Sequence, residues 1–256
     1  MTPISLIITT YNRPDALDMV LKSVRRQSLM PAEVIVADDG STRETRETVA
    51  KWSGKLPLIH SWLPDHGFRA ARSRNLAAIK TTSDYIVFVD GDCLLPKTFL
   101  ESHSRLAEPQ KLVAGGRKLL SRAQTEFILT QTDQTPLESA FQGPKFYRFP
   151  LGELRNIHKK NSGSVRSCNM GIFKDDFFQV SGFDEQYIGW GREDTDLVLR
   201  LLNSGVSIKS ARLAACVAHL WHPDESRECL KANENLLIDT ANLYKIRASK
   251  GVVGYL

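Results

Sequence analysis

The stretch Tyr85-Ile86-Val87-Phe88-Val89-Asp90-Gly91-Asp92 decides the fold of this 256-residue chain. Its first five residues are apolar or aromatic and predict a buried β-strand that ends at the first aspartate. The two carboxylates lie two positions apart and so share one face, and the glycine between them lets a ligand approach the backbone closely. Such a pair suits a hard divalent cation, which prefers oxygen ligands and can also hold a diphosphate. An ordinary turn after a strand, rich in Asp and Gly, is the alternative interpretation.

The first half of the chain alternates apolar strand-like runs with helix-like segments. Strands are expected over 4–10, 33–37 and 58–63, and helices from Pro14, from about Arg43 and through Arg69, Arg72 and Arg74. This alternation is typical of an α/β fold with a Rossmann-like, mostly parallel sheet flanked by helices. Ligands of such folds bind in the crevice at the carboxyl ends of the strands, where Asp39, Asp90 and Asp92 are expected to lie.

The second half of the chain has a weaker pattern. Irregular structure is expected from about 116 to 163, apart from a short helix near 136–141. Beyond it ordered structure is expected to resume over 165–173, followed by a helix through Leu197 and Leu201, a strand near 206–218 and a helix from about 225 to 247. With no repeat or linker, the chain is predicted to be a single domain. A nucleotide-sugar binding half (1–115) is continuous with an elaborated acceptor-binding and catalytic half (116–256).

Composition and charge exclude several classes of protein. Hydrophobic residues make up 42% and charged residues 25%, as in ordinary globular proteins, and no run approaches the roughly 18 apolar residues of a membrane span. The net charge of +5 is too small and scattered to indicate a nucleic-acid partner. It is compatible with a polyanionic substrate or with weak docking at an anionic membrane surface.

The cysteines and the two ends of the chain indicate in which compartment of the cell the protein is expected. Four cysteines without metal-ligand spacing, and an N-terminus that reads as a first strand rather than a signal peptide, favour a cytoplasmic protein. Peripheral association with the inner face of the membrane fits the same observations. Lys245, Arg247 and Lys250, close to the apolar tail, can contact a membrane or another subunit, or belong to a frayed terminus. The oligomeric state stays open.

Several motifs together resemble two known groups of enzymes. Thr10-Tyr11-Asn12-Arg13-Pro14, Val36-Ala37-Asp38-Asp39-Gly40-Ser41, Arg72-Ser73-Arg74-Asn75 and Asp90-Gly91-Asp92 resemble the family 2 glycosyltransferases of GT-A fold. The C-terminal half resembles the galactosyltransferase-like segment of animal galactosyl- and N-acetylgalactosaminyltransferases and of bacterial chondroitin-type polymerases. Its markers are Gly182-Phe183-Asp184-Glu185, Gly189-Trp190-Gly191-Arg192-Glu193-Asp194-Thr195-Asp196 and Val217-Ala218-His219. Each motif alone is loose, but their order and spacing are specific.

The resemblance implies a site for a uridine nucleotide. Asp39 would accept a hydrogen bond from uracil N3–H, and Thr10-Tyr11-Asn12-Arg13 would form the other wall of the nucleoside pocket. A carboxylate only accepts and uracil N3 only donates, whereas cytosine has no hydrogen at N3. The alternative is a polar turn in which Ser41 or Thr42 caps the next helix.

The same resemblance places Arg74 and Asn75 against the donor nucleotide. A helix start beside basic side chains attracts phosphate, which suits such a position. Arg72 is equally well explained as an ordinary solvated helix residue.

The resemblance also implies Mn²⁺ or Mg²⁺ as a cofactor. Asp92 is the better candidate for direct ligation, with Asp90 nearer the ribose or a metal-bound water. In the related segments a histidine at the place of His219 completes the coordination, while His222 is a lesser candidate that can contact the diphosphate instead. Two histidines at this spacing are too little to define a metal site, and a packed, hydrogen-bonded histidine is the alternative.

For catalysis, the resemblance implies that Asp194 is the general base and that Glu193, beside it, binds the acceptor. Trp190 offers a flat apolar surface on which a sugar ring can stack. Because the two acids are adjacent, the sequence leaves open which one faces the acceptor. Asp196 is assigned mainly to the helix dipole, an interaction worth roughly 0.3–1 kcal/mol at exposed sites.

These expectations combine into an inverting, metal-dependent transfer of a hexose, Gal or GalNAc or Glc, from a UDP-sugar to a hydroxyl of a glycan or lipid-linked glycan. Bacterial surface polysaccharide or lipopolysaccharide synthesis is the expected setting. One alternative is a catalytically silent nucleotide- or glycan-binding module. The other is a sugar-1-phosphate nucleotidyltransferase, which usually needs a glycine-rich phosphate loop where this chain has Thr10-Tyr11-Asn12-Arg13-Pro14.

Overall fold

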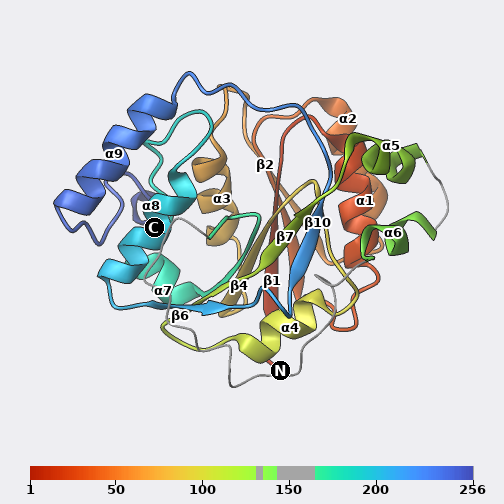
Figure 1. Cartoon of the computed structure of the whole chain (residues 1–256), viewed down its shortest axis with the longest axis horizontal. Helices are drawn as coiled ribbons and strands as arrows, with labels where there is room; N and C mark the ends of the chain where they lie inside the picture. Colours follow the sequence, from red (N-terminus) through yellow and green to blue (C-terminus); the bar gives the residue numbers. More distant parts are fainter. Residues whose placement is uncertain (131–134, 143–164, 256) are drawn as a thin grey trace.

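The structure is a computed structural model that describes residues 1–130, 135–142 and 165–255. A seven-stranded sheet forms its centre, and a second sheet of three short strands packs into the core on one of its faces (Figure 1). In spatial order, the large sheet contains β3 (Leu58–Trp62), β2 (Glu33–Asp38), β1 (Ile4–Thr10), β4 (Tyr85–Asp90), β8 (Asn169–Phe173), β6 (Lys111–Ala114) and β9 (Ser207–Ser210).

All strands of the large sheet except β8 run in the same direction. β8 is antiparallel to both of its neighbours, β4 and β6, whereas the other pairings are parallel. This confirms the predicted mostly parallel α/β sheet. Thr10 pairs with Asp38, and Thr9 pairs with Asp90, so the carboxyl ends of β1, β2 and β4 meet at one edge.

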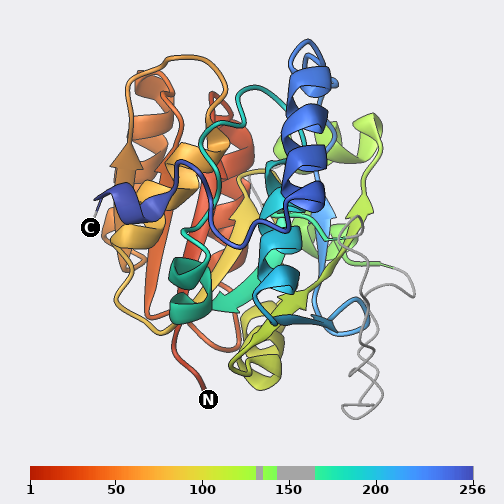
Figure 2. The ribbon, with the colours of Figure 1, turned by 90° about the vertical axis from the view of Figure 1, so that its left-hand side faces the viewer.

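Helices cover both faces of this sheet (Figures 1 and 2). Within β1, Leu6 and Ile8 enter one buried core while Ile7 enters the other. Because both faces are covered, the strands read in the sequence as continuous apolar runs. The first core receives α1 (Pro14–Val24), α2 (Arg43–Ser53) and α4 (Phe99–Leu106), and the second receives α3 (Ala70–Ile79), α7 (Lys174–Gln179) and α8 (Glu193–Asn203).

The single strand expected near 206–218 is wrong. The structure has two strands there, β9 in the large sheet and β10 (Cys216–His219) in the small one, where β10 lies between β5 (Cys93–Leu94) and β7 (Gly116–Leu119). A turn separates them, closed by hydrogen bonds from the Ala214 and Ala215 amides to the Ala211 carbonyl. The turn contains no Gly or Pro, so the sequence gives no local signal for it.

The irregular structure expected from 116 to 163 is wrong for the residues that the structure describes there. It contains β7, α5 (Arg122–Thr130) and α6 (Thr135–Ala140), of which only α6 was expected. α5 buries only Thr125 and Ile128, too little for a clear helical pattern. β7 takes its place by pairing with β10 rather than from an apolar run of its own. Residues 143–164 of this expectation lie outside the described residues.

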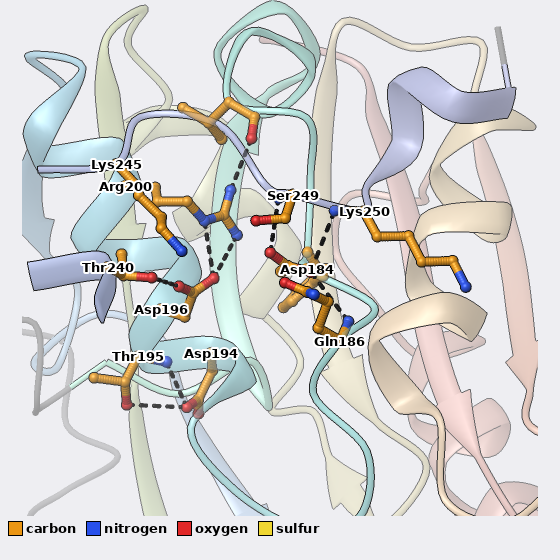
Figure 3. A network of polar contacts seen from close by, with 12 residues as sticks. Asp184, Gln186, Asp194, Thr195, Asp196, Arg200, Thr240, Lys245, Ser249 and Lys250 are labelled. Atoms are coloured by element: carbon orange, nitrogen blue, oxygen red, sulfur yellow. Dashed lines mark hydrogen bonds and ion pairs between the residues drawn. The ribbon is translucent and has the colours of Figure 1, made fainter. Parts of the chain in front are cut away.

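The C-terminal part returns to the second half of the sheet. α9 (Leu230–Asn242) packs against α8, and the segment after it ends in a short 3-10 helix, η4 (Val252–Tyr255). Asp184 accepts hydrogen bonds from the Ser249 and Lys250 amides at 2.8 and 3.4 Å, which ties this segment down (Figure 3). Among the described helices, none is long and apolar enough to span a bilayer.

Asp196 is a buried anchor between helices rather than a charge that serves only the helix dipole. Its Oδ2 lies 2.8 Å from Arg200 Nε, and its Oδ1 accepts a hydrogen bond of 2.7 Å from the Thr240 hydroxyl of α9 (Figure 3). Arg200 also donates to the Val180 carbonyl, at 2.7 Å. Both charged side chains are 1% exposed, so each depends on the other for compensation of its charge.

Replacing Asp196 by Ala is expected to lower the free energy of unfolding by about 3–5 kcal/mol, because it leaves the Arg200 charge buried without a partner. Chemical denaturation measures this loss. Glu47→Ala is the control: it removes the exposed Arg43–Glu47 ion pair and should cost less than about 1 kcal/mol. A loss for Asp196→Ala no larger than that of the control would contradict the buried anchor.

Candidate active site

The carboxyl edge of the sheet brings three of the predicted motifs together. The amide of Asp39 donates to the Thr10 carbonyl at 3.0 Å, and that of Gly91 donates to the Thr9 carbonyl at 2.7 Å. A Cβ atom at Gly91 would lie only 3.0–3.1 Å from atoms of Thr9 and Thr10. The glycine between the two acids therefore lets β1 approach closely, a role beyond the ligand access expected from the sequence.

The adjacent acids Asp38 and Asp39 have different surroundings. Asp38 is fully buried and bonds to the Ser41 amide and to His60 Nε2, both at 2.8 Å. Burial raises the pKa of Asp38, but the hydrogen bonds from His60 and Ser41 outweigh it and leave that pKa below its usual value. Asp39 accepts a hydrogen bond of 2.6 Å from the Arg69 amide. Burial raises its pKa to about 6, so Asp39 is the acid with the less compensated charge.

The segment after β1 forms a wall beside Asp39. Asn12, in the left-handed region at φ 46°, joins the loops after β1 and β2: its amide donates to Ser41 Oγ, and its Oδ1 accepts from the Thr42 amide, both at 2.9 Å. Tyr11 is half-exposed, and its hydroxyl donates to Asp65 at 2.9 Å. Arg13 pairs with its near neighbour in the chain, Asp15, at 3.4 Å.

The expected capping of the next helix by Ser41 or Thr42 is not made. Thr42 occupies the N-cap position of α2 without a side-chain hydrogen bond to the helix backbone, and its hydroxyl donates to Glu44 instead. The Ser41 hydroxyl is engaged with Asn12. These loop residues therefore hold the two loops together rather than start the helix.

Arg74 joins the donor motifs to the acidic pair of the second half. Its guanidinium is 4% exposed and reaches Thr9 Oγ1 at 3.0 Å, Asp90 Oδ1 at 3.0 Å and Glu193 Oε1 at 3.1 Å. It also lies 5.3 Å from the centre of the Phe183 ring. Burial disfavours its charge, but Asp90 and Glu193 outweigh that effect and keep the pKa of Arg74 above its usual value.

Asn75 is directed into the protein. It is fully buried, its Nδ2 donates to the Phe183 carbonyl at 2.9 Å and to Glu185 at 3.1 Å, and its Oδ1 accepts from the Phe183 amide at 2.9 Å. Both amide hydrogens and the carbonyl are thus occupied by protein groups. The geometry gives Asn75 a structural role, the anchoring of residues 183–185, instead of the predicted contact with the donor.

Asp92, His219 and His222 form a cluster that can hold a metal ion. Asp92 lies 3.6 Å from His219 Nε2 and 3.5 Å from His222 Nε2, and one ligand atom from each residue lies within 4.8 Å of the others. One ion with metal–ligand distances of about 2.1 Å joins donors up to about 4.2 Å apart, a limit that both Asp92–histidine distances meet. A carboxylate with two imidazoles is a donor set for a divalent metal ion, and imidazole is a more usual ligand of transition metals than of Mg²⁺. Asp90 lies outside the cluster and pairs with Arg74.

The acidic pair opens α8 directly after Arg192, whose φ of 79° is left-handed. Burial, with the charge of Asp194 adding to it, raises the pKa of Glu193, while Arg74 acts in the opposite direction. Asp194 Oδ1 accepts from the amide and hydroxyl of Thr195, at 2.7 and 3.2 Å, and no hydrogen bond within the described part of the chain reaches its Oδ2. Of the two acids, Glu193 is therefore engaged with Arg74, and Asp194 keeps an oxygen available.

Trp190 precedes this pair and is 41% exposed, with the Arg227 guanidinium 5.6 Å from its ring centre. Sequence reasoning missed three partners of the site residues: His60 beside Asp38, Asp65 beside Tyr11, and the Arg69 amide beside Asp39. All three belong to β3 or the loop that follows it. The position of that loop at the same sheet edge was the available signal.

The chain belongs to glycosyl transferase family 2, because the model of that family matches residues 5–180. A second model, for the N-terminal domain of galactosyltransferase, matches residues 154–223, which include the acidic pair and both histidines of the cluster. This agrees with the resemblance of both halves of the sequence.

Three relatives illustrate the range of the family. Validoxylamine A glucosyltransferase of Streptomyces hygroscopicus subsp. limoneus is 29% identical over 82% of this chain and 50% of its own length. Chondroitin synthase of Escherichia coli is 25% identical over 90% of this chain and 36% of its own. The putative teichuronic acid biosynthesis glycosyltransferase TuaG of Bacillus subtilis is 23% identical over 90% of this chain and 91% of its own. The chain thus spans half or less of the first two relatives and most of the third.

Solved structures share the fold. Staphylococcus aureus TarS 1–349 in complex with UDP-GlcNAc has a TM-score of 0.67 at 19% identity, covering 98% of this chain and 69% of that one. A mannosyltransferase from Pyrobaculum calidifontis in complex with GDP-Man and Mn²⁺ has a TM-score of 0.60 at 18% identity, covering 98% and 66%. At such identities the likeness shows the fold alone, which is the predicted GT-A fold.

We expect His219→Ala and His222→Ala each to weaken Mn²⁺ binding at least about tenfold, because removal even of outer-shell partners of metal ligands costs that much. Titration of the metal-free protein with Mn²⁺, followed by calorimetry, measures the affinity. Asp90→Asn should stay within about threefold of wild type, since Asp90 lies outside the cluster. Equal losses for Asp90→Asn and the histidine variants would contradict the assignment of ligands.

Proposed function

We propose that this protein is an inverting, metal-dependent glycosyltransferase that moves a hexose from a UDP-sugar to a hydroxyl of a glycan or lipid-linked glycan. One observation carries the proposal: Arg74 bridges Asp90 and Glu193 at 3.0 and 3.1 Å. This bridge places the start of α8, with Asp194, next to the acidic motif at the end of β4. A candidate base and a candidate metal–diphosphate site thereby share one edge of the sheet.

The donor side is argued from Asp39. A buried carboxylate whose hydrogen-bonding partner within the protein is one backbone amide can accept the N3–H of uracil. The half-exposed ring of Tyr11 and the loop held by Asn12 would form the wall of this pocket. The UDP and UDP-GlcNAc complexes of TarS support a uridine nucleotide. Because the Pyrobaculum enzyme is in complex with GDP-Man, the choice between uracil and guanine is tested by experiment below.

Mn²⁺ or Mg²⁺ would be held by Asp92, His219 and His222, the cluster described above. When bound, such an ion neutralises the charge that develops on a departing diphosphate. Burial raises the pKa of Asp92 in the protein alone, so a bound cation would also stabilise the ionised carboxylate.

At the acceptor side, Asp194 would take the proton of the attacking hydroxyl. Its unengaged Oδ2 can reach an acceptor, whereas Glu193 is oriented by Arg74 and would bind a neighbouring acceptor hydroxyl. Trp190, which is 41% exposed, would stack on the sugar ring.

The relatives bear on the hexose and the setting. A glucosyltransferase, a chondroitin synthase and a teichuronic acid biosynthesis protein are among them, which supports glucose, galactose or N-acetylgalactosamine as the sugar and a bacterial surface polysaccharide as the product. We infer that the protein works in the cytoplasm or at the inner face of the membrane, where nucleotide sugars are available. Peripheral membrane contact through Lys245, Arg247 and Lys250 belongs to the same proposal.

Asp194→Asn is expected to lower kcat about 10²–10⁴-fold, the usual contribution of a general base, while leaving UDP affinity unchanged. Steady-state turnover with UDP-hexoses and a panel of glycan acceptors, together with UDP titration, measures both. Glu193→Gln should act mainly on the acceptor KM. Wild-type turnover retained by Asp194→Asn and lost by Glu193→Gln would reverse the two roles, and binding of UDP without turnover by wild type would indicate a silent binding module.

The affinity for a UDP-sugar is expected to fall about tenfold as the pH is lowered from 7.5 to 5. One unit below a pKa of about 6, only about a tenth of Asp39 remains ionised to accept the uracil N3–H. Calorimetric titration with UDP-glucose and with GDP-mannose at both pH values tests the pH effect and the preference for uracil over guanine. Asp39→Asn should bind more weakly and lose this part of the pH response; an unchanged response would assign it to other groups, such as the histidines.

A further inference from the structure

The loop of residues 188–192, here termed the acceptor loop, has an unusual backbone. Gly189, Gly191 and Arg192 have φ values of 72°, 104° and 79°, in the region that side chains rarely adopt. The loop carries Trp190 and leads directly into Glu193. Glycine adopts such φ values freely, but Arg192 keeps its left-handed conformation only where the surrounding structure holds it.

Asn233, on α9, holds the acceptor loop from one side. Its side-chain Nδ2 donates to the Ile188 carbonyl at 3.1 Å and to the Gly191 carbonyl at 2.9 Å. Both amide hydrogens are used, and the two carbonyls lie on either side of Trp190. Asn233 is 2% exposed, so water does not replace these bonds easily.

The start of α9 and its N-cap residue, Cys229, also fit against this loop. A Cβ atom at Gly189 would lie 2.9 Å from the Cβ of Cys229, and one at Gly191 would lie 3.2 Å from a methyl group of Leu230. Glu234 adds an ion pair of 2.7 Å with Arg192. The first turns of α9 and the acceptor loop are therefore complementary in both shape and hydrogen bonding.

The opposite side of the acceptor loop rests on the donor side of the site. The Gly189 amide donates to the Phe68 carbonyl at 3.0 Å. The amide of the following residue, Arg69, donates to Asp39 at 2.6 Å. The loop thus lies between α9 and the segment that contacts the candidate uracil-binding acid.

We propose that Asn233 is a positioning residue that fixes the acceptor loop, and with it Trp190 and the start of α8, in the conformation that binds the acceptor. This inference rests on the proposed function. Asn233 is not a catalytic residue, since it contacts only two backbone carbonyls. Without its two hydrogen bonds, the acceptor loop loses contacts that hold its left-handed residues. The ring of Trp190 then takes several orientations instead of one.

Asn233→Asp tests the proposal with a side chain of nearly the same shape. It places a carboxylate oxygen against two carbonyl oxygens and removes both donated bonds. We expect the acceptor KM to rise about tenfold or more, while the affinity for UDP and the rate of donor hydrolysis without acceptor stay near wild type. Hydrogen exchange of the Gly189 amide should become about tenfold faster or more, a readout that requires no acceptor.

Thr240→Val is the matched control. Thr240 lies on the same helix, is 3% exposed and makes one buried hydrogen bond to Asp196, and within the described residues it makes no hydrogen bond to the acceptor loop. It should lower stability while leaving the exchange of Gly189 and the acceptor KM unchanged. If Asn233→Asp leaves both readouts at wild-type values, or if the control shifts them equally, the positioning role is overturned.

Different outcomes of these measurements count against the positioning role and against the proposed function. Absence of both transfer and donor hydrolysis in folded wild-type protein counts against the glycosyltransferase assignment, whatever the variants do. Normal wild-type turnover with an unchanged acceptor KM in Asn233→Asp counts against the positioning role alone.

Discussion

The arrangement of this site depends on one buried cation, the guanidinium of Arg74. It lies in the middle of α3, is 4% exposed and joins β1 through Thr9, β4 through Asp90 and α8 through Glu193. A buried ion is costly unless it is paired and hydrogen-bonded, and here two carboxylates and a hydroxyl meet that requirement. The same contacts bring residues more than a hundred positions apart in the chain to one point. The cation therefore organises the site electrostatically, as a centre to which the acidic groups of both halves are drawn.

The candidate metal cluster depends on a second constraint, the small sheet. β5 follows Asp92 directly, and its pairing with β10 sets His219 opposite Cys93. A hydrogen bond of 2.9 Å from the Leu220 amide to the Asp92 carbonyl extends this pairing. Asn169 of β8 donates to the carbonyls of Gly116 and Ala215, at 2.8 and 2.9 Å, and so fastens the small sheet to the large one. His219 thus faces Asp92 because of backbone register, whereas His222 lies beyond the end of β10.

Local patterns in the sequence predicted the parts of this molecule whose structure is decided locally. Continuous apolar runs identified β1, β2 and β4, since strands buried on both faces need no other signal. The strand β7 escaped prediction because it forms through pairing with β10, far away in the chain, and the turn between β9 and β10 escaped it because that turn contains no Gly or Pro. The same division holds in the site: the acids were found by their motifs, whereas the engagement of Arg74 with Glu193 and the inward orientation of Asn75 are tertiary contacts without a sequence signature.

The two family models do not cover the C-terminal part of the chain, although the fold shared with TarS covers 98% of the whole chain. Together the models extend from residue 5 to 223, so α9 with Asn233 and Glu234 lies beyond both. The transfer reaction makes common demands on a family: a carboxylate that binds the nucleobase, ligands for a metal ion and a general base for the acceptor hydroxyl. The acceptors themselves differ from one member to the next. A helix outside the family models that shapes the acceptor loop is where such differences can accumulate without disturbing Arg74 or the metal cluster. The Phe68–Gly189 hydrogen bond and the Arg74–Glu193 pair are among the contacts that join the donor motifs to the acceptor loop and to α8.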